Sequence, residues 1–390
     1  MKFGDMSNLT TRIVTDVAGW EQLSPYWDPL LNASHDSTPW QNWDYLTHWW
    51  KHLGKTKKLR IVVVERGGEP VMIFPLQLGP ENMIGLNTRI LEPIAMLWDV
   101  NRPRFAIGAP DDDAFRAGLD AILGFKKEWD TLRVEELPID DAQSRALDVF
   151  AAQNGFRFRY AQSSVVPFIK VDCSWQDFLK TRGSKMKKNL RASLRKLEAM
   201  APVTLTSHES PEEVYEAYKI TLALHAKSWK RKKKVGLSLS KDFEAFFSGF
   251  LDGMARRGQT RILVLRAGDK PVAATIAFTH LDTYFSTEIV HDAAYAACSP
   301  GTLLESFELE RVMNERQYAN YDFLGRFLSN KQRWTDQARI THRIYIFRPS
   351  LTNWLLDLHY FRAKPAIKRM WRTLFGLSKS TAQAMRFMKR

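Results

Sequence analysis

The chain contains the same glycine-proline turn twice, each time between two runs typical of β-strands. The two turns are Arg66-Gly67-Gly68-Glu69-Pro70-Val71 and Ala267-Gly268-Asp269-Lys270-Pro271-Val272. The flanking strand-like runs are 59–64, 71–78, 261–266 and 272–279. Glycine-containing turns between such runs predict β-hairpins. The order strand, helix, strand, helix, strand follows each hairpin, so the sequence predicts two copies of one architecture.

Apolar spacing gives the remaining elements of each copy. In the first half we expect strands at 12–15, 89–98, 131–134 and 156–160, and helices at 20–31, 113–125, 140–153 and from Thr38-Pro39 through Trp50. In the second half we expect strands at 203–207, 284–290, 321–324 and 343–347, and helices at 211–227, 241–256 and 300–315. Pro300 suits the first turn of the last helix. The predicted fold class is α+β, with two tandem domains that each have a mixed sheet flanked by helices.

Charge is distributed unevenly along the chain. Residues 1–165 hold 18 Lys and Arg against 22 Asp and Glu, whereas the remainder holds 39 against 21. A half with a net charge of +18 predicts an anionic partner such as a nucleotide cofactor, a nucleic acid, a phosphorylated substrate or a membrane surface. Charge alone does not choose among these partners.

The cysteine content and the N-terminus indicate a cytoplasmic protein. Cys173 and Cys298 have no CxxC partner, so we expect neither a disulfide framework nor a zinc site, and no metal. The first residues lack the apolar core of a signal peptide. The sequence contains no run of about 18 apolar residues, so we expect no membrane-spanning helix.

Two basic segments lie outside the repeated units. Residues 175–200 place an apolar stripe (Phe178, Met186, Leu190, Leu194, Leu197) beside many Lys and Arg. The segment 351–390 combines nine basic residues and one acid with several large apolar residues. We therefore predict a domain at 1–165, a second at 166–350 that is catalytic, and a basic amphipathic tail at 351–390.

Several short motifs follow one another in an order typical of one family. They are Thr38-Pro39-Trp40-Gln41-Asn42-Trp43, Trp49-Trp50, Phe74-Pro75-Leu76, Trp175, Arg182, the basic helix 188–197, His225 with Trp229, Ser299-Pro300-Gly301, and Asp322-Phe323-Leu324 followed by Lys331 and Trp334. Over roughly residues 35–350 the chain resembles the GNAT-related acyltransferases of the CelD (cellulose biosynthesis) type. These are relatives of the FemAB-type aminoacyl transferases.

The resemblance implies an N-acyltransferase that moves an acyl group from acyl-CoA, a loosely bound co-substrate, to an amine. Its setting would be exopolysaccharide or cell-envelope synthesis. The cofactor pyrophosphate is expected at the start of the helix from Pro300, at Ser299, Gly301 and Thr302, because a helix N-terminus suits an anion. Lys331 is expected to contact the phosphate or the acyl donor; it lies nine residues after Asp322, as in the family pattern.

The catalytic candidates are Asp322, Lys331 and His225. Asp322 is either a general base or a brace for the following loop. His225 has the side chain suited to accept a proton near neutral pH, although a helical histidine beside leucines is commonly a packed residue. Lys331 is either a site residue or a surface lysine that starts a short helix.

Five residues are candidates for binding the substrate: Arg182, Lys188, Arg191, Arg195 and Trp229. The four cations are either a phosphate-binding cluster or a solvated helix face. Together with the run Lys230-Arg231-Lys232-Lys233-Lys234 they favour an anionic partner. Trp229 is expected to form a pocket wall rather than to take part in chemistry.

Two other functions remain open. An aminoacyl-tRNA-dependent transferase of the FemAB kind would use the basic half to bind tRNA. A non-catalytic binding or scaffold protein would explain why the segment 291–302 lacks the glycine-rich loop of ordinary GNAT enzymes and why Gly325, Arg326 and Asn330 depart from the family pattern. The tail 351–390 either packs on the domain or contacts an anionic membrane surface. We favour the membrane surface, which would make the protein peripheral at the inner membrane face.

Overall fold

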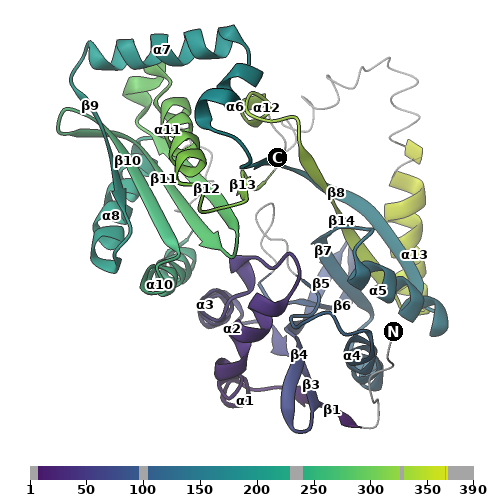
Figure 1. The fold of residues 1–390 in the computed structure, drawn as a ribbon. Coiled ribbons are helices and arrows are strands. Elements are labelled where there is room, and N and C mark those ends of the chain that lie inside the picture. The colour runs from purple at the N-terminus through teal and green to yellow at the C-terminus, as the bar shows by residue number, and fades with distance from the viewer. Residues whose placement is uncertain (1–7, 96–103, 229–239, 326–328, 365, 368–390) are drawn as a thin grey trace.

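The computed structural model describes residues 8–95, 104–228, 240–325, 329–364 and 366–367 (Figure 1). Across these residues, helices pack against sheets whose neighbouring strands are both parallel and antiparallel. The predicted α+β class with a mixed sheet is confirmed.

The first half follows the predicted order. Its strands are β1 (Leu9–Val14), β2 (Lys58–Leu59), β3 (Ile61–Arg66), β4 (Glu69–Phe74), β5 (Leu76–Met83), β6 (Leu86–Pro93), β7 (Thr131–Leu137) and β8 (Arg157–Lys170). Its helices are α1 (Val17–Glu21), α2 (Ser24–Ala33), the 3-10 turn η2 (Pro39–Gln41), α3 (Trp43–Leu53), α4 (Asp112–Gly124), the 3-10 turn η3 (Lys126–Glu128) and α5 (Ala142–Gln153). The first predicted hairpin is formed by β3 and β4.

The second half repeats the pattern behind two additional helices. Its strands are β9 (Val203–His208), β10 (Thr260–Ala267), β11 (Lys270–His280), β12 (Thr283–His291), β13 (Asn320–Asp322) and β14 (Ala338–Phe347). Its helices are α6 (Trp175–Thr181), α7 (Ser184–Glu198), α8 (Pro211–Lys227), α10 (Lys241–Arg256), the 3-10 turn η4 (Ala293–Cys298), α11 (Pro300–Glu315), α12 (Ser329–Gln332), α13 (Leu351–Asp357) and the π-helical turn η5 (Leu358–Ala363). The second predicted hairpin is formed by β10 and β11.

One long sheet runs through both halves. Its strand order is β2-β5-β6-β7-β14-β8-β13-β12-β11-β10-β9, and β1, β3 and β4 form a separate small sheet. The start of β8 pairs with β14, whereas its last residues, Phe168–Lys170, pair with β13. Strand β8 therefore belongs to the sheets of both halves, as Figure 1 shows.

The last predicted strand lies in a different place from the one expected. Residues 343–347 were expected to close the second half, but β14 pairs with β7 and β8 of the first half. Strand β14 is far from both of its partner strands in sequence, so apolar spacing does not reveal this pairing. The predicted division at residue 165 lies inside β8, and we propose that the two halves fold as one unit.

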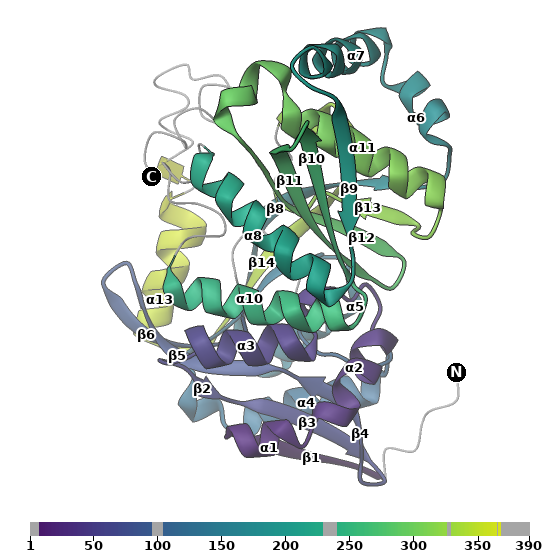
Figure 2. The ribbon, with the colours of Figure 1, turned by 90° about the vertical axis from the view of Figure 1, so that its left-hand side faces the viewer.

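The two halves share an apolar core between α3 and α10. Trp40 and Tyr45 of the first half contact Phe250 and Phe278 of the second, with ring centroids 5.5 Å apart for Trp40–Phe278 and 4.9 Å for Tyr45–Phe250. All four rings are buried. Figure 2 shows α3 and α10 side by side. Aromatic pairs in this geometry add about 0.5–1.5 kcal/mol each beyond their burial.

Two glycines of α10 permit this close approach, and their replacement gives a test. A Cβ at Gly249 would lie 2.2 Å from the His48 ring, and one at Gly253 would lie 2.5 Å from Asp44 Cγ. We expect Gly249→Ala/Gly253→Ala to lower the free energy of unfolding by about 1–3 kcal/mol, the usual cost of overpacking. Chemical denaturation measures this change.

Gly124→Ala is the matched control, because nothing lies within 4 Å of a Cβ at this helical position. This control should be neutral or slightly stabilising, since alanine is the better helix former. Equal stability of the double variant and the control would contradict close packing of α3 on α10.

Candidate active site

The candidate site is built on the β12–α11–β13 unit of the second half. Strands β12 and β13 pair in parallel over only three residues, Thr283–Phe285 with Asn320–Asp322. Beyond this point β12 continues to His291, while β13 ends at Asp322. After the Phe285–Asp322 pair, β12 therefore continues without pairing to β13, and the sheet opens at its carboxyl end, where ligands bind in open sheets of this kind.

Helix α11 begins beside this opening. Ser299 precedes it in the left-handed conformation (φ 50°), Pro300 occupies the first turn, and the first turn contains no acidic residue. Ser299 is exposed, whereas Gly301 and Thr302 are half-buried. Oriented N–H groups give a helix N-terminus a partial positive charge. Three of the four predicted cofactor-binding residues therefore share one electropositive helix start, and the fourth, Lys331, lies on α12.

Glu305 lies one turn further along α11 and is almost fully buried. Its Oε2 accepts a hydrogen bond of 2.5 Å from Trp334 Nε1. Burial raises the pKa of Glu305 to about 7; the Trp334 hydrogen bond opposes the rise, the Glu308 charge adds to it, and Arg333 and Lys331 oppose it. A carboxyl group with a pKa near neutral can accept and release a proton at physiological pH.

Arg333 connects the helix start to the segment after α12. Its Nη1 donates a hydrogen bond of 2.9 Å to Thr302 Oγ1. The Arg333 side chain is exposed, and its cation is close enough to lower the pKa of Glu305. An exposed cation therefore lies beside the partial positive charge of the α11 start, and both favour a bound anion.

Glu308 lies on the same side of α11, deeper in the core. Its carboxylate accepts hydrogen bonds from Tyr321 (2.6 Å), Tyr284 (3.0 Å), Ser286 (3.0 Å) and Thr275 (3.4 Å). Burial raises its pKa, and these hydroxyl groups oppose the rise. The network fixes α11 against β11, β12 and β13, and so fixes the position of Glu305.

Asp322 and Lys331 both hold the loop that follows β13. Asp322 is fully buried; its Oδ1 accepts from Leu324 N (2.8 Å) and its Oδ2 from Arg339 Nη1 (2.9 Å). Lys331 Nζ donates to the carbonyl oxygens of Phe323 (2.9 Å) and Leu324. Leu324 has a positive φ of 50°, a conformation that requires such support.

Arg182 joins the first helix of the second half to the same segment. Its Nη1 donates a hydrogen bond of 2.9 Å to Trp334 O, and its guanidinium lies 5.3 Å from the Phe178 ring centre. Lys188, Arg191 and Arg195 are exposed on α7, whose apolar residues pack toward α11. Arg191 also lines a hollow of about 220 Å³ between α6, α7 and α11.

The histidine predicted as a proton acceptor lies outside the β12–α11–β13 unit. His225 is buried near the end of α8, and its carbonyl oxygen accepts from Ser228 N (3.1 Å) and Ser228 Oγ (2.8 Å). Trp229 and the basic run 230–234 lie outside the described residues.

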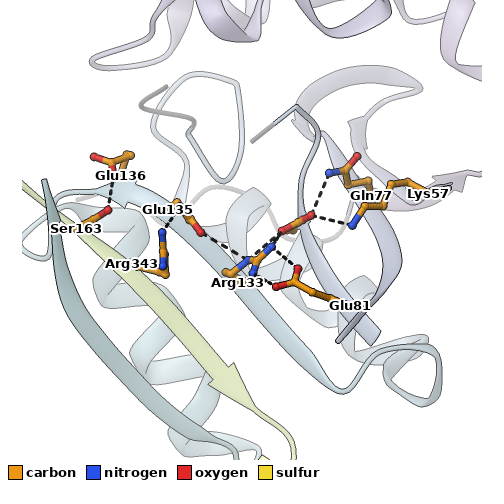
Figure 3. A network of polar contacts seen from close by, with 9 residues as sticks. Lys57, Gln77, Glu81, Arg133, Glu135, Glu136, Ser163 and Arg343 are labelled. Atoms are coloured by element: carbon orange, nitrogen blue, oxygen red, sulfur yellow. Dashed lines mark hydrogen bonds and ion pairs between the residues drawn. The ribbon is translucent and has the colours of Figure 1, made fainter. Parts of the chain in front are cut away.

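The corresponding position of the first half is filled by its own charges (Figure 3). Strands β6 and β7 are again parallel and pair over only two residues. Arg133 of β7 binds Glu92 of β6 (2.5 Å) and Glu81 of β5 (2.8 Å), and Glu135 binds Arg343 of β14 (2.7 Å). Burial raises the pKa of Glu135, which Arg343 and Arg133 oppose.

The helix that follows this opening is also unsuited to an anion. Helix α4 is capped by Asp111 and carries Asp112 and Asp113 in its first turn. These carboxylates already occupy the positive end of the helix. An anionic donor therefore fits the start of α11 better than the start of α4.

Sequence reasoning missed Glu305, Glu308 and Arg333. One signal was present, because Glu305 and Glu308 lie three residues apart among leucines in a predicted helix, which places two carboxylates on one side. Their burial depends on Trp334, Tyr284 and Tyr321, which are 13 to 29 residues away in sequence.

Comparison with known proteins agrees with this geometry. Residues 184–334 match the family model described as an acetyltransferase (GNAT) domain. Over this segment the chain is similar to GNAT acetyltransferase domains. The match includes α7, the start of α11, Glu305 and Trp334, so the GNAT fold class predicted from the sequence is confirmed. The CelD type within it stays a prediction, and no curated protein sequence matches the chain significantly.

Several solved structures share the fold. FemX aligns with a TM-score of 0.59 at 10% identity, covering 90% of this chain and 99% of that chain. The C-terminal domain of a putative lysylphosphatidylglycerol synthetase from Agrobacterium fabrum aligns with a TM-score of 0.51 at 11% identity, covering 87% of this chain and 97% of that chain. L-PGS from Bacillus licheniformis gives 0.50 at 14% identity, covering 86% and 95%. Identities this low show a common fold alone.

Within the described part of the chain, none of the helices combines the length and the apolar character that a membrane span requires. Among the same residues, no group of three or more His, Cys, Asp and Glu side chains gathers in a way that could hold a metal ion.

The pKa of Glu305 predicts a pH-dependent stability. Because this pKa is about 7 in the folded chain and 4.5 ordinarily, the folded chain binds more protons between these pH values. The contribution of Glu305 to stability is therefore present at low pH and is lost as pH rises toward 7. We expect the free energy of unfolding of the wild type to fall by about 2–3 kcal/mol between about pH 5 and pH 8, and we expect this fall to be absent in Glu305→Gln.

Urea denaturation of both proteins across this pH range measures the difference. Glutamine keeps an oxygen that accepts from Trp334, so the variant tests the charge and not the hydrogen bond. Glu198→Gln, at an exposed position of α7, is the control and should follow the wild type. Parallel stability curves for wild type and Glu305→Gln would rule out the raised pKa.

Proposed function

We propose that this protein is an N-acyltransferase that moves an acyl group from acyl-CoA to an amine, with the donor bound at the start of α11. The observation that carries the proposal is the acid-free helix start beside the β12–β13 opening, with Arg333 bound to Thr302. The GNAT match over residues 184–334 supports it. The donor phosphates would lie at Ser299, Gly301 and Thr302, in the positive field of the helix start and beside the Arg333 guanidinium.

The chemistry needs two further contributions. The amine must lose a proton as it attacks the thioester carbonyl, and the donor and acceptor must be held in one geometry. We assign the proton acceptor to Glu305, because its pKa of about 7 suits transfer at neutral pH. Asp322 and His225 stay alternative proton acceptors, and Lys331 would shape the donor-binding loop through the carbonyl groups of Phe323 and Leu324.

The basic face of α7 favours a second candidate donor. Lys188, Arg191 and Arg195 are exposed on a helix that packs along α11, so an extended polyanion that entered at α11 would also meet them. An aminoacyl-tRNA is such a donor, and a FemAB-like transferase is therefore the second candidate. Arg182 would serve either donor by fixing the Trp334 backbone.

The acceptor and the setting are proposed from the family resemblance. They are an amine-bearing small molecule or saccharide in exopolysaccharide or cell-envelope synthesis, on the cytoplasmic side. A non-catalytic scaffold stays the third candidate, and Trp229 stays a predicted pocket residue.

Thermal stabilisation by ligands tests the proposed donor. We expect acetyl-CoA or a longer acyl-CoA to raise the Tm, as a ligand at about 100 times its Kd adds about 2.7 kcal/mol. The same acyl group on pantetheine, which lacks the phosphates, should give little shift. Arg333→Ala should weaken acyl-CoA binding about five- to tenfold, because one charged contact is lost. Arg256→Ala, an exposed arginine of α10, is the matched control.

Other results would select among the candidates. A salt-sensitive tRNA gel shift without any CoA response would favour the aminoacyl-tRNA donor. Release of free thiol from acyl-CoA with an amine panel would establish turnover, and Glu305→Gln should then lower kcat and remove the acidic limb of the pH profile. No response to either donor would leave the scaffold.

A further inference from the structure

Helix α13 has three of its four apolar residues facing outward. Leu351, Trp354 and Leu355 lie on one side of the helix by their spacing and are 74%, 49% and 36% exposed. On the other side, Asn353, Leu356 and Asp357 are 2%, 0% and 1% exposed. A surface helix of a globular protein ordinarily buries its apolar side, whereas α13 buries Leu356 together with two polar residues, so this arrangement is largely reversed.

The reversed orientation is fixed by polar contacts of the buried side. Asn353 Nδ2 donates to Asp130 O (2.7 Å) and Arg348 O (2.8 Å). Asp357 accepts from Arg157 (2.8 Å) and Arg159 (2.7 Å) of β8. If the helix were rotated to bury its apolar side, the Asp357 carboxylate and the Asn353 amide would lose these hydrogen-bond partners. Each lost buried contact of this kind costs on the order of 1–3 kcal/mol. The exposed leucines and tryptophan are therefore held outward.

A cavity with three arginines lies beside this face. It has a volume of about 500 Å³, and Arg157, Arg159, Arg348 and Trp354 are among its lining residues. Arg157 and Arg159 share the single carboxylate of Asp357, and Arg348 binds the carbonyl oxygens of Lys126 and Trp129. The cavity thus offers more cationic than anionic groups and has an aromatic rim.

The sequence continues in the same character. Residues 358–390 contain nine Lys and Arg and no Asp or Glu. Arg362 and Lys364 are exposed on the turns that follow α13. An apolar face, a tryptophan at its centre and surrounding cations are the combination that binds the interface of an anionic bilayer.

We propose that the α13 face, defined as Leu351, Trp354 and Leu355 with the adjoining arginine cavity, binds the surface of an anionic lipid bilayer. Leu351, Trp354 and Leu355 insert among the headgroups, and the arginine cavity takes a lipid phosphate. Nucleic acid fits less well, since the exposed aliphatic side chains find no partner on a phosphate backbone. This proposal is independent of the acyl donor.

Vesicle co-sedimentation of the full chain tests the proposal. We expect binding to vesicles of phosphatidylcholine mixed with phosphatidylglycerol, weaker binding to phosphatidylcholine alone, and a fall in binding as salt is added. Leu351→Ser/Trp354→Ser should lower the affinity about tenfold or more, because apolar insertion is lost. Both positions are exposed, so the variant should fold, and circular dichroism checks this.

Tyr215→Ser on α8 is the matched control, because Tyr215 is 57% exposed and α8 lies far from α13 in Figure 1. The control should bind like the wild type. Unchanged vesicle binding by the double variant would overturn the proposal, and any binding would then be attributed to the charges of the basic tail. Concentration-dependent dimerisation without vesicle binding would overturn it in favour of a second copy. Acyl transfer to a soluble amine should be equal in all three proteins, which separates this proposal from the proposed function.

Discussion

The hydrogen-bonded ladder of β14 with β7 and β8 is the constraint on which the rest of the structure depends. It returns the end of the chain to the first half, while β8 continues into the sheet of the second half. The segment between β13 and β14 must therefore cross from one half to the other, and it carries Lys331, Arg333 and Trp334. The described contacts of this segment with α11 are Arg333–Thr302 and Trp334–Glu305. They lie between β13, inside the GNAT match, and β14, outside it, so the candidate site depends on both halves.

The two halves use the same opening between parallel strands in different ways. In the first half, Arg133 and its carboxylate partners fill the opening, and α4 begins with acidic residues. In the second half, α11 begins without an acid. The overall charges agree, since the first 165 residues carry a net −4 and the remainder +18. Of the two corresponding helix starts, the one at α11 is therefore free of acidic residues, which supports the proposed anion-binding position there, whereas the opening of the first half holds ion pairs.

Local features of the fold could be predicted, whereas long-range partners could not. Pro300 and the apolar spacing after it gave α11 its correct bounds, and the glycine turns gave both hairpins. The partners of β14 lie about 200 residues away in sequence, and the spacing of apolar residues within a strand gives no information on so distant a partner. Sequence gave Asp322 and Lys331 as site candidates, and the structure brings both to the loop after β13. Glu305 could not be predicted, because its pKa is raised by burial in the folded core and its hydrogen-bond partner Trp334 is 29 residues away in sequence.

Strand β14 also sets the geometry between the candidate site and the α13 face. It follows the site segment at Ala338 and leads into α13 after Phe347. Ten residues of strand span roughly 30 Å, and the pairing of β14 on both sides makes this distance rigid. A bilayer bound at α13 would therefore lie far from Glu305 unless the molecule lay along the surface. Membrane binding at this face would concentrate the protein at the bilayer, and the acceptor of the proposed transfer would have to project from the bilayer or come from solution.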